Sequence, residues 1–86
     1  MSSTPSARTP EELLELLAKG LVDAPEQVSV ERFDEGDGTV VLELSVGPGD
    51  YGKVIGRGGQ TAKALRTVVR AAAAKQTRRL VLDIVD

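Results

Sequence analysis

A short glycine-rich segment, Gly56-Arg57-Gly58-Gly59, is the feature that most constrains how this 86-residue chain can fold. The apolar pair Val54-Ile55 precedes it, and an alanine-rich stretch typical of a helix follows it directly. Glycine lacks a Cβ, so the backbone can turn sharply there and come close to a ligand. A helix that begins just after such a loop presents unpaired N–H groups and a partial positive charge. The segment therefore predicts two helices joined by a loop that can contact an anionic phosphate.

Basic residues are concentrated in the half of the chain that holds this glycine loop. The net charge is −2, but residues 1–50 carry three basic and eleven acidic residues, whereas residues 51–86 carry eight basic and two acidic ones. No acidic residue lies between Tyr51 and Leu82. Such asymmetry indicates a polyanionic partner, although two halves that pair with each other would also produce it. We favour the partner because the basic half also contains the loop.

The composition argues against catalysis and against bound metal. The chain has no histidine and no cysteine, which removes the commonest general base, thiolate chemistry and the commonest transition-metal ligands. No serine lies beside a base. We therefore expect no enzyme activity, no metal and no cofactor. Since no apolar run approaches the length of a membrane span and nothing resembles a signal peptide, we expect a cytoplasmic protein.

Two nucleotide-binding motifs near the loop fail on their chemistry. Residues 47–52 satisfy G-x-G-x-x-G, and Gly47, Gly52 and Lys53 give a partial Walker A match. Asp50 would place a negative charge in either phosphate cradle, and Val54 stands where Walker A needs a hydroxyl for Mg²⁺. The chain is also too short for a doubly wound sheet. We reject both interpretations.

The first half predicts a helix followed by a hairpin. Residues 1–8 are polar and are expected to be a disordered tail, and residues 9–12 (Thr-Pro-Glu-Glu) have the pattern of a capped helix start. This helix should end by Val22, because Pro25 follows shortly. Strands are predicted at 27–33 and 39–46, with a turn at 34–38. The predicted apolar face of the helix is Leu13, Leu14, Leu17 and Leu21, and the predicted core face of the second strand is Val40, Leu42, Leu44 and Val46.

The second half predicts two more helices and a strand. A short helix at 51–55, which Asp50 can cap, precedes the loop, and a longer helix runs from Thr61 to about Lys75. The longer helix has an apolar stripe made of Ala62, Leu65, Val69 and Ala72, with Val68 beside it. A separate basic stripe on it consists of Lys63, Arg66 and Arg70. A last strand alternates at Leu80, Leu82 and Ile84. We therefore expect one α+β domain at 9–86, a two-layer sandwich (αββααβ) with a three-stranded sheet and helices on one face.

This order of elements, with a Gly-x-x-Gly loop between adjacent helices, resembles the type II KH arrangement. The segment 50–69 (DYGKVIGRGGQTAKALRTVV) and the ending 80–86 (LVLDIVD) resemble small bacterial single-KH proteins of the KhpA type. The resemblance covers roughly residues 9–86. It implies an RNA-binding protein that acts as a homodimer or with a larger KH-containing partner of the KhpB (Jag) type, in pairs linked to RNA metabolism and control of cell elongation and shape.

The resemblance also implies which residues contact RNA. Gly56, Arg57, Gly58 and Gly59 would hold the sugar–phosphate backbone, while Val54, Ile55 and Leu65 would support the floor of a narrow groove. Lys53 would assist Arg57 in holding phosphates. Gly58 stands where a polar or basic residue is frequent, and Gln60 stands where arginine is common, so this loop has a single cation. A looser grip is expected.

The charged residues permit simpler interpretations as well. Arg57 could be a solvated loop residue, but its flanking glycines favour a phosphate contact. Lys63 and Arg66 are as consistent with RNA contact as with a wet helix face, and Arg70 lies further from the loop. We interpret Lys75, Arg78 and Arg79 as solubilising residues or an electrostatic fringe.

Two functions follow from the sequence. The first is a non-catalytic binder of single-stranded RNA, a chaperone or regulator with low sequence specificity, since Phe33 and Tyr51 are the only aromatic residues. The alternative is a protein–protein dimerisation module in which RNA binding is secondary. The predicted RNA-binding residues are Lys53, Val54, Ile55, Gly56, Arg57, Gly58, Gly59, Lys63 and Arg66.

Overall fold

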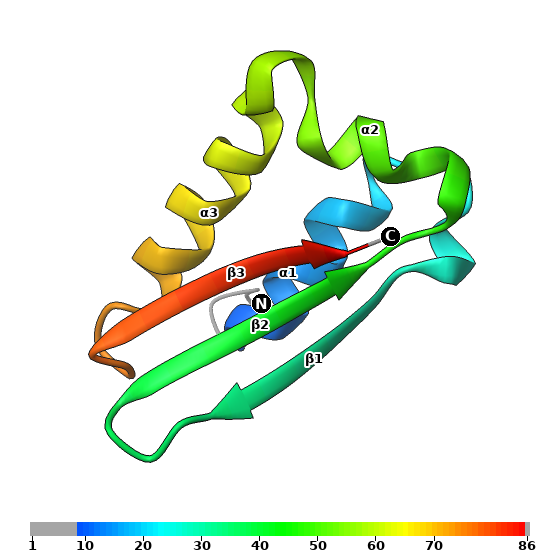
Figure 1. The fold of residues 1–86 in the computed structure, drawn as a ribbon. Helices are drawn as coiled ribbons and strands as arrows, with labels where there is room; N and C mark the ends of the chain where they lie inside the picture. The colour runs from blue at the N-terminus through cyan, green and yellow to red at the C-terminus, as the bar shows by residue number, and fades with distance from the viewer. Residues whose placement is uncertain (1–8, 86) are drawn as a thin grey trace, which may run out of the picture.

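The computed structural model describes residues 9–85, and the order of their main elements is α1, β1, β2, α2, α3, β3 (Figure 1). Their bounds are Pro10–Lys19 (α1), Ser29–Asp34 (β1), Thr39–Ser45 (β2), Tyr51–Ile55 (α2), Gln60–Ala73 (α3) and Arg79–Val85 (β3). The tail expected at residues 1–8 lies outside the described part of the chain, as does residue 86. The predicted order of elements is confirmed.

The strands form one mixed sheet in the order β1-β2-β3. β1 pairs antiparallel with β2 across a tight turn, whereas β3 pairs parallel with β2. A parallel pair needs a long crossover connection, and here α2, the glycine loop and α3 provide it. α1 lies behind the sheet in Figure 1, and α1 and α3 contact each other. The predicted α+β two-layer architecture is therefore confirmed, and the crossover places the loop at one end of the molecule.

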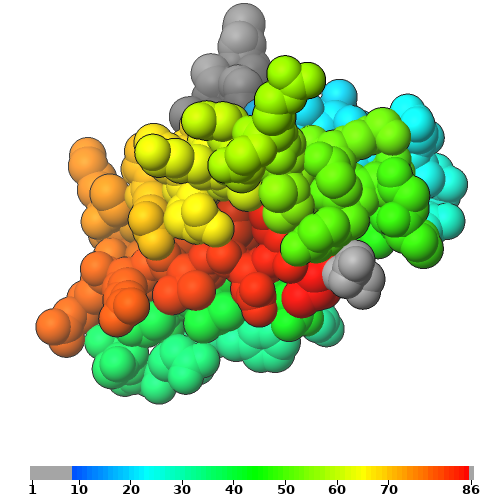
Figure 2. Space-filling model, turned by 45° about the horizontal axis from the view of Figure 1, so that its top comes forward, coloured from blue at the N-terminus to red at the C-terminus, as the bar shows by residue number. Residues whose placement is uncertain are grey.

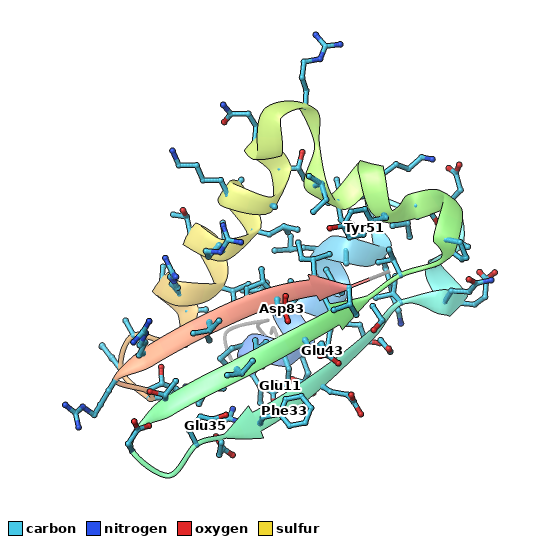
Figure 3. All side chains as sticks on the ribbon, viewed as in Figure 1. Glu11, Phe33, Glu35, Glu43, Tyr51 and Asp83 are labelled. Carbon is cyan, nitrogen blue, oxygen red and sulfur yellow. The ribbon has the colours of Figure 1, made fainter. Side chains whose placement is uncertain are left out.

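The core lies between the helices and one face of the sheet. Alternation along β2 buries Val40, Leu42 and Leu44, as the sequence predicted. Leu14 of α1 and Val69 of α3 are fully buried against them. The intervening residues of the strands lie on the opposite face, where the labelled side chains of Glu43, Asp83 and Phe33 can be seen (Figure 3). One face of the sheet is therefore left uncovered in the described chain.

The first helix begins as predicted and ends earlier. Thr9 Oγ1 accepts a hydrogen bond from Glu12 N at 3.2 Å, and Glu12 Oε1 accepts one from Thr9 N at 3.0 Å, which completes a capping box. The helix ends at Lys19, so Leu21 lies beyond it and is 41% exposed. The prediction that Leu21 belongs to the buried helix face is wrong, because the chain leaves the helical path before that position.

The buried stripe of α3 differs from the prediction at its last member. Ala62, Leu65 and Val69 are buried, but Ala73 rather than Ala72 completes the stripe. Val69 and Ala73 are both fully buried, so the centre of the stripe lies near these two residues. At about 100° per residue, Ala73 lies about 40° around the helix from Val69, whereas Ala72 lies about 60° from it on the other side. Val68 is 45% exposed.

Asp50 does not cap α2 through its side chain, so that prediction is wrong. Its carboxylate instead accepts hydrogen bonds from Asp23 N at 3.1 Å and Ala24 N at 3.0 Å. These donors lie in the connection between α1 and β1, more than 25 residues away in the sequence. Asp50 is buried and ties that connection to the start of α2. Both donors belong to backbone that is far from Asp50 in the sequence, so the residues around Asp50 could not predict this contact.

Candidate nucleic-acid interface

The glycine loop has a backbone that only glycine adopts readily. Gly56 has φ 76° and ψ 171°, and Gly58 and Gly59 have φ of 63° and 80°. A Cβ on Gly56 would overlap Thr61 Oγ1 and lie 2.9 Å from Thr61 N. Gly58 has no such neighbour, so only its φ disfavours a side chain. Gly56 therefore lets the loop close tightly onto the start of α3.

The closed loop directs backbone donors outward. Gly56 N donates to Gly52 O at 2.8 Å, and Gly59 N donates to Gly56 O at 3.1 Å. The N–H groups of Arg57 and Gly58 make no hydrogen bond to any described residue. Both residues are exposed, so these two donors and the Arg57 guanidinium are available at the tip of the loop. Adjacent N–H groups of this kind can bind a phosphate oxygen.

The basic stripe of α3, made of Lys63, Arg66 and Arg70, faces the edge of the sheet. Arg70 Nε donates a hydrogen bond to Leu80 O of β3 at 3.1 Å. Lys63 and Arg66 lie about two turns and one turn before Arg70 on the same side of the helix. Figure 2 shows α3, in yellow, beside β3, in red, on one face of the molecule, with the glycine loop at their upper edge. The stripe therefore continues from the loop along the boundary between α3 and β3.

The cations of this region have no acidic counterparts within reach. None of the basic side chains between residues 57 and 79 lies within 4.0 Å of a carboxylate oxygen among the residues the structure describes. Ion pairs in the described chain involve Lys19, Arg32 and Lys53 instead. The basic surface is therefore free to attract a polyanion.

Lys53 differs from the other predicted cations because carboxylates surround it. Its Nζ lies 3.2 Å from Asp23 Oδ2 and 3.4 Å from Asp50 Oδ1. Hydrogen bonds to Asp23 and Asp50 raise the pKa of Lys53, with the Asp23 bond the larger cause. The structure places Lys53 one helical turn before the loop, but part of its charge is already balanced.

The apolar residues around the loop have different degrees of burial. The side chain of Val54 is fully buried, and Ile55 is half-buried. Val54 can therefore support a groove only from beneath, whereas Ile55 can reach its surface. Leu65 borders a different feature, an apolar hollow of about 240 Å³ between α1 and α3. The hollow is lined by Leu17, Leu21, Thr61, Ala64, Leu65 and Val68.

Sequence reasoning missed this hollow because it placed Leu21 and Val68 in or beside the core. Both are apolar at helical spacing, which is the pattern of a packed face. The structure shows that both remain exposed, because α1 ends before Leu21 and because Val68 lies outside the buried stripe of α3. In the described residues, no helix is long and apolar enough to span a membrane, and no group of three or more acidic side chains is arranged to hold a metal ion.

Comparison with known proteins gives one consistent result. The family model for the KhpA/KhpB KH domain matches residues 11–84. A protein of Halalkalibacterium halodurans, named RNA-binding protein KhpA, is 57% identical over 74 residues, which cover 86% of this chain and 96% of the relative. Proteins of the same name from Clostridium acetobutylicum and Streptomyces coelicolor are 50% and 51% identical, over 86% and 88% of this chain and 97% and 91% of the relatives.

Proposed function

The chain belongs to the KhpA/KhpB family of KH-domain proteins, and we propose that it is a non-catalytic protein that binds the backbone of single-stranded RNA. The similar proteins are themselves named as RNA-binding. KH domains use a Gly-x-x-Gly loop to hold about four nucleotides. We place the protein in the cytoplasm, where RNA is available.

The observation that carries this proposal is the pair of N–H groups at Arg57 and Gly58, which donate to none of the residues that the structure describes. They lie beside an exposed guanidinium and at the start of a basic stripe with no described carboxylate partner. Phosphate oxygens would accept hydrogen bonds from the N–H groups of the loop, and Lys63 and Arg66 would neutralise the next phosphates along α3. Ile55 would contact a base from the loop side, with Val54 packed beneath, and Lys53 would add a weaker, partly balanced charge.

Low sequence specificity follows from the scarcity of groups that read bases. Phosphate contacts fix position without reading sequence, whereas RNA readers that discriminate bases often stack them on aromatic rings. Phe33 pairs with Val41, and both lie on the face of the sheet opposite the helices (Figure 3). Tyr51 is packed against the core. A chaperone or a broad regulator of RNA is therefore the expected role.

The double variant Arg57→Asp with Gly58→Asp tests this function. It should abolish binding of a short single-stranded RNA, because it replaces the loop cation and adds carboxylates where phosphate oxygens would accept. Asp tolerates a left-handed backbone better than most residues, so the circular dichroism spectrum should be unchanged. The matched control is Lys19→Asp with Gly49→Asp, which makes the same charge change at exposed positions away from the loop. RNA retention by the loop variant equal to that of the control would refute the proposal.

The apolar hollow supports a second function, assembly with another protein. Leu21 and Val68 expose apolar surface beside it, and the hollow has almost no polar lining. A second copy of the chain, or a larger KH-containing partner of the KhpB (Jag) type, would cover it. Val68→Asp should then shift the mass measured by light scattering at several concentrations toward the monomer, while a monomer still binds RNA. An unchanged mass, or a strict monomer with no uptake of a KhpB-type partner, would argue against this function.

A further inference from the structure

A second group of cations lies at the end of the molecule away from the glycine loop. Arg70, near the end of α3, and Arg78 and Arg79, at the start of β3, form what we call the distal basic cluster. They line a surface pocket of about 340 Å³ together with Ala74, Thr77 and Leu80. In Figure 2 this region is the orange surface, next to the green turn between β1 and β2. The sequence alone predicts that Arg78 and Arg79 are solubilising residues or an electrostatic fringe.

The fold holds Arg78 in place at this cluster. Arg78 N and Arg79 N both donate to Gly38 O, at 2.8 and 3.3 Å, and Arg78 Nη1 donates to Asp37 O at 3.4 Å. A Cβ on Gly38 would lie 2.7 Å from Arg78 Cγ, so the stem of Arg78 rests directly on that glycine. A side chain that is already fixed loses little freedom when it binds a ligand.

Arg70 connects this cluster to the basic stripe. Its bond to Leu80 O fixes the guanidinium at the boundary between α3 and β3, on the wall of the pocket. Arg70 is therefore the last member of the stripe and the first member of the cluster. The cations form a continuous series from the loop to the start of β3.

The charge of the cluster is only partly offset. Asp37 is an acidic neighbour of the cluster and lines an adjoining pocket with Thr39, Arg78 and Arg79. Its carboxylate accepts a hydrogen bond from Thr39 N at 3.0 Å, which is the main reason that the pKa of Asp37 is lowered. This one carboxylate shares the adjoining pocket with Arg78 and Arg79, and the cluster has three guanidinium groups, so a net positive charge remains available.

We propose that the distal basic cluster binds a phosphodiester group of the same RNA strand that the glycine loop holds, beyond the four nucleotides of the loop site. This inference rests on the proposed function. A guanidinium can donate two parallel hydrogen bonds to a phosphate, which suits a pocket lined by three arginines. The 14 residues of α3 separate the two anchors by about 20 Å, and Lys63 and Arg66 lie between them. An acidic protein segment would match the charge of the cluster alone but not its alignment with the loop.

The experiment compares two lengths of single-stranded oligouridylate, 5 and 15 nucleotides, on the full chain. Arg78→Gln with Arg79→Gln should leave affinity for the 5-mer within about twofold. For the 15-mer, the slope of log affinity against log salt should become shallower by about 0.7, the contribution of one neutralised phosphate, which corresponds to roughly a fivefold loss at 0.1 M salt. The matched control, Lys19→Gln with Lys75→Gln, removes two cations that do not line the pocket. The 15-mer offers more positions at which the loop can bind than the 5-mer does, and this advantage is the same in both variants. The ratio of their affinities for the 15-mer therefore reports the effect of the cluster alone.

The outcomes separate this inference from the function on which it rests. Failure of the unaltered protein to bind either oligonucleotide would refute the proposed function. If the 5-mer binds normally and the cluster variant and the control have the same affinity for the 15-mer, only the distal site is overturned. The same conclusion follows if the cluster variant loses equal affinity for the 5-mer and the 15-mer. If the unaltered protein binds a polyglutamate peptide, and the cluster variant loses this binding but keeps its affinity for the 15-mer, the proposed RNA contact at the cluster is overturned in favour of an acidic protein partner.

Discussion

Gly58 determines how many cations the loop offers. Its φ of 63° disfavours a side chain, yet nothing lies within 4 Å of the position where a Cβ would stand. We predict that Gly58→Lys raises affinity for a short RNA about fivefold at 0.1 M salt, through one more phosphate contact. The left-handed backbone should lower the free energy of unfolding by about 1 kcal/mol.

Fluorescence anisotropy and urea unfolding measure these two effects. Gly49→Lys is the control, because Gly49 is also exposed and has an open Cβ position but lies before α2. An equal gain in affinity in both variants would show that added charge acts through the general field, without a specific contact at the loop.

Asp50 links stability to pH. The N–H groups of Asp23 and Ala24, the former most strongly, and the Lys53 ammonium lower its pKa in the folded state. A lowered folded-state pKa stabilises the fold fully above the ordinary carboxyl pKa near 4 and loses this effect as the pH falls below it. We predict that Asp50→Asn lowers the melting temperature at pH 6 and that the difference from the unaltered protein shrinks by pH 2.5.

Thermal unfolding at pH 6, 3.5 and 2.5 provides the measurement. Glu26→Gln is the control, since Glu26 is an exposed carboxylate in the neighbouring 3₁₀ turn and belongs to no described ion pair. A difference in melting temperature that persists unchanged at pH 2.5 would contradict the role of the Asp50 charge.

At the scale of elements, the sheet carries like charges in register. Glu43 of β2 pairs with Glu31 of β1 and with Asp83 of β3, on the face opposite the core. Like charges directly opposite each other destabilise a sheet. We predict that Glu43→Gln raises the free energy of unfolding by about 0.5 kcal/mol at low salt, and less at high salt.

Urea unfolding at two salt concentrations tests this effect, with Glu35→Gln in the β1–β2 turn as the control outside the row. A loss of stability in Glu43→Gln would show that the carboxylates are held by favourable contacts. RNA affinity should change little, because the carboxylates of Glu31, Glu43 and Asp83 lie on the face of the sheet opposite the helices.

The elements themselves were largely predictable from sequence, because their signals are local. The capping box at Thr9 and Glu12, the alternation along β2 and the glycines of the loop depend on residues a few positions apart. Some errors are local, such as the end of α1 before Leu21, and others concern long-range partners. Asp50 is a residue type that often caps helices, but the N–H groups that it binds belong to the connection before β1. The hollow lined by Val68 depends on where α1 ends and on which side of α3 packs against the sheet. The membership of the RNA-binding site stays a prediction.

For the whole molecule, charge is divided between two regions. The net charge is −2, so a uniform sphere with this charge would repel RNA, and added salt would screen that repulsion and strengthen binding. Among residues 9–85, the cations without an ion-pair partner instead lie in the glycine loop, along α3 and at the start of β3, while acidic residues lie on α1, in the connection after it, in the β1–β2 hairpin and on the open face of the sheet. The local field at the loop is thus opposite in sign to the total charge.

We therefore predict that affinity for a 5-nucleotide RNA falls as salt rises, with a slope near −2 in a plot of log affinity against log salt. Arg57, Lys63 and Arg66 would each neutralise one phosphate, and each neutralised phosphate on a single strand contributes about 0.7 to the slope. Between 0.05 and 0.2 M salt the affinity should drop about fifteenfold. Arg66→Gln should reduce the slope by about 0.7, whereas Lys19→Gln, on α1, should leave it unchanged. A slope of zero or above would show that the total charge governs the encounter and would remove the electrostatic basis for RNA binding on this face.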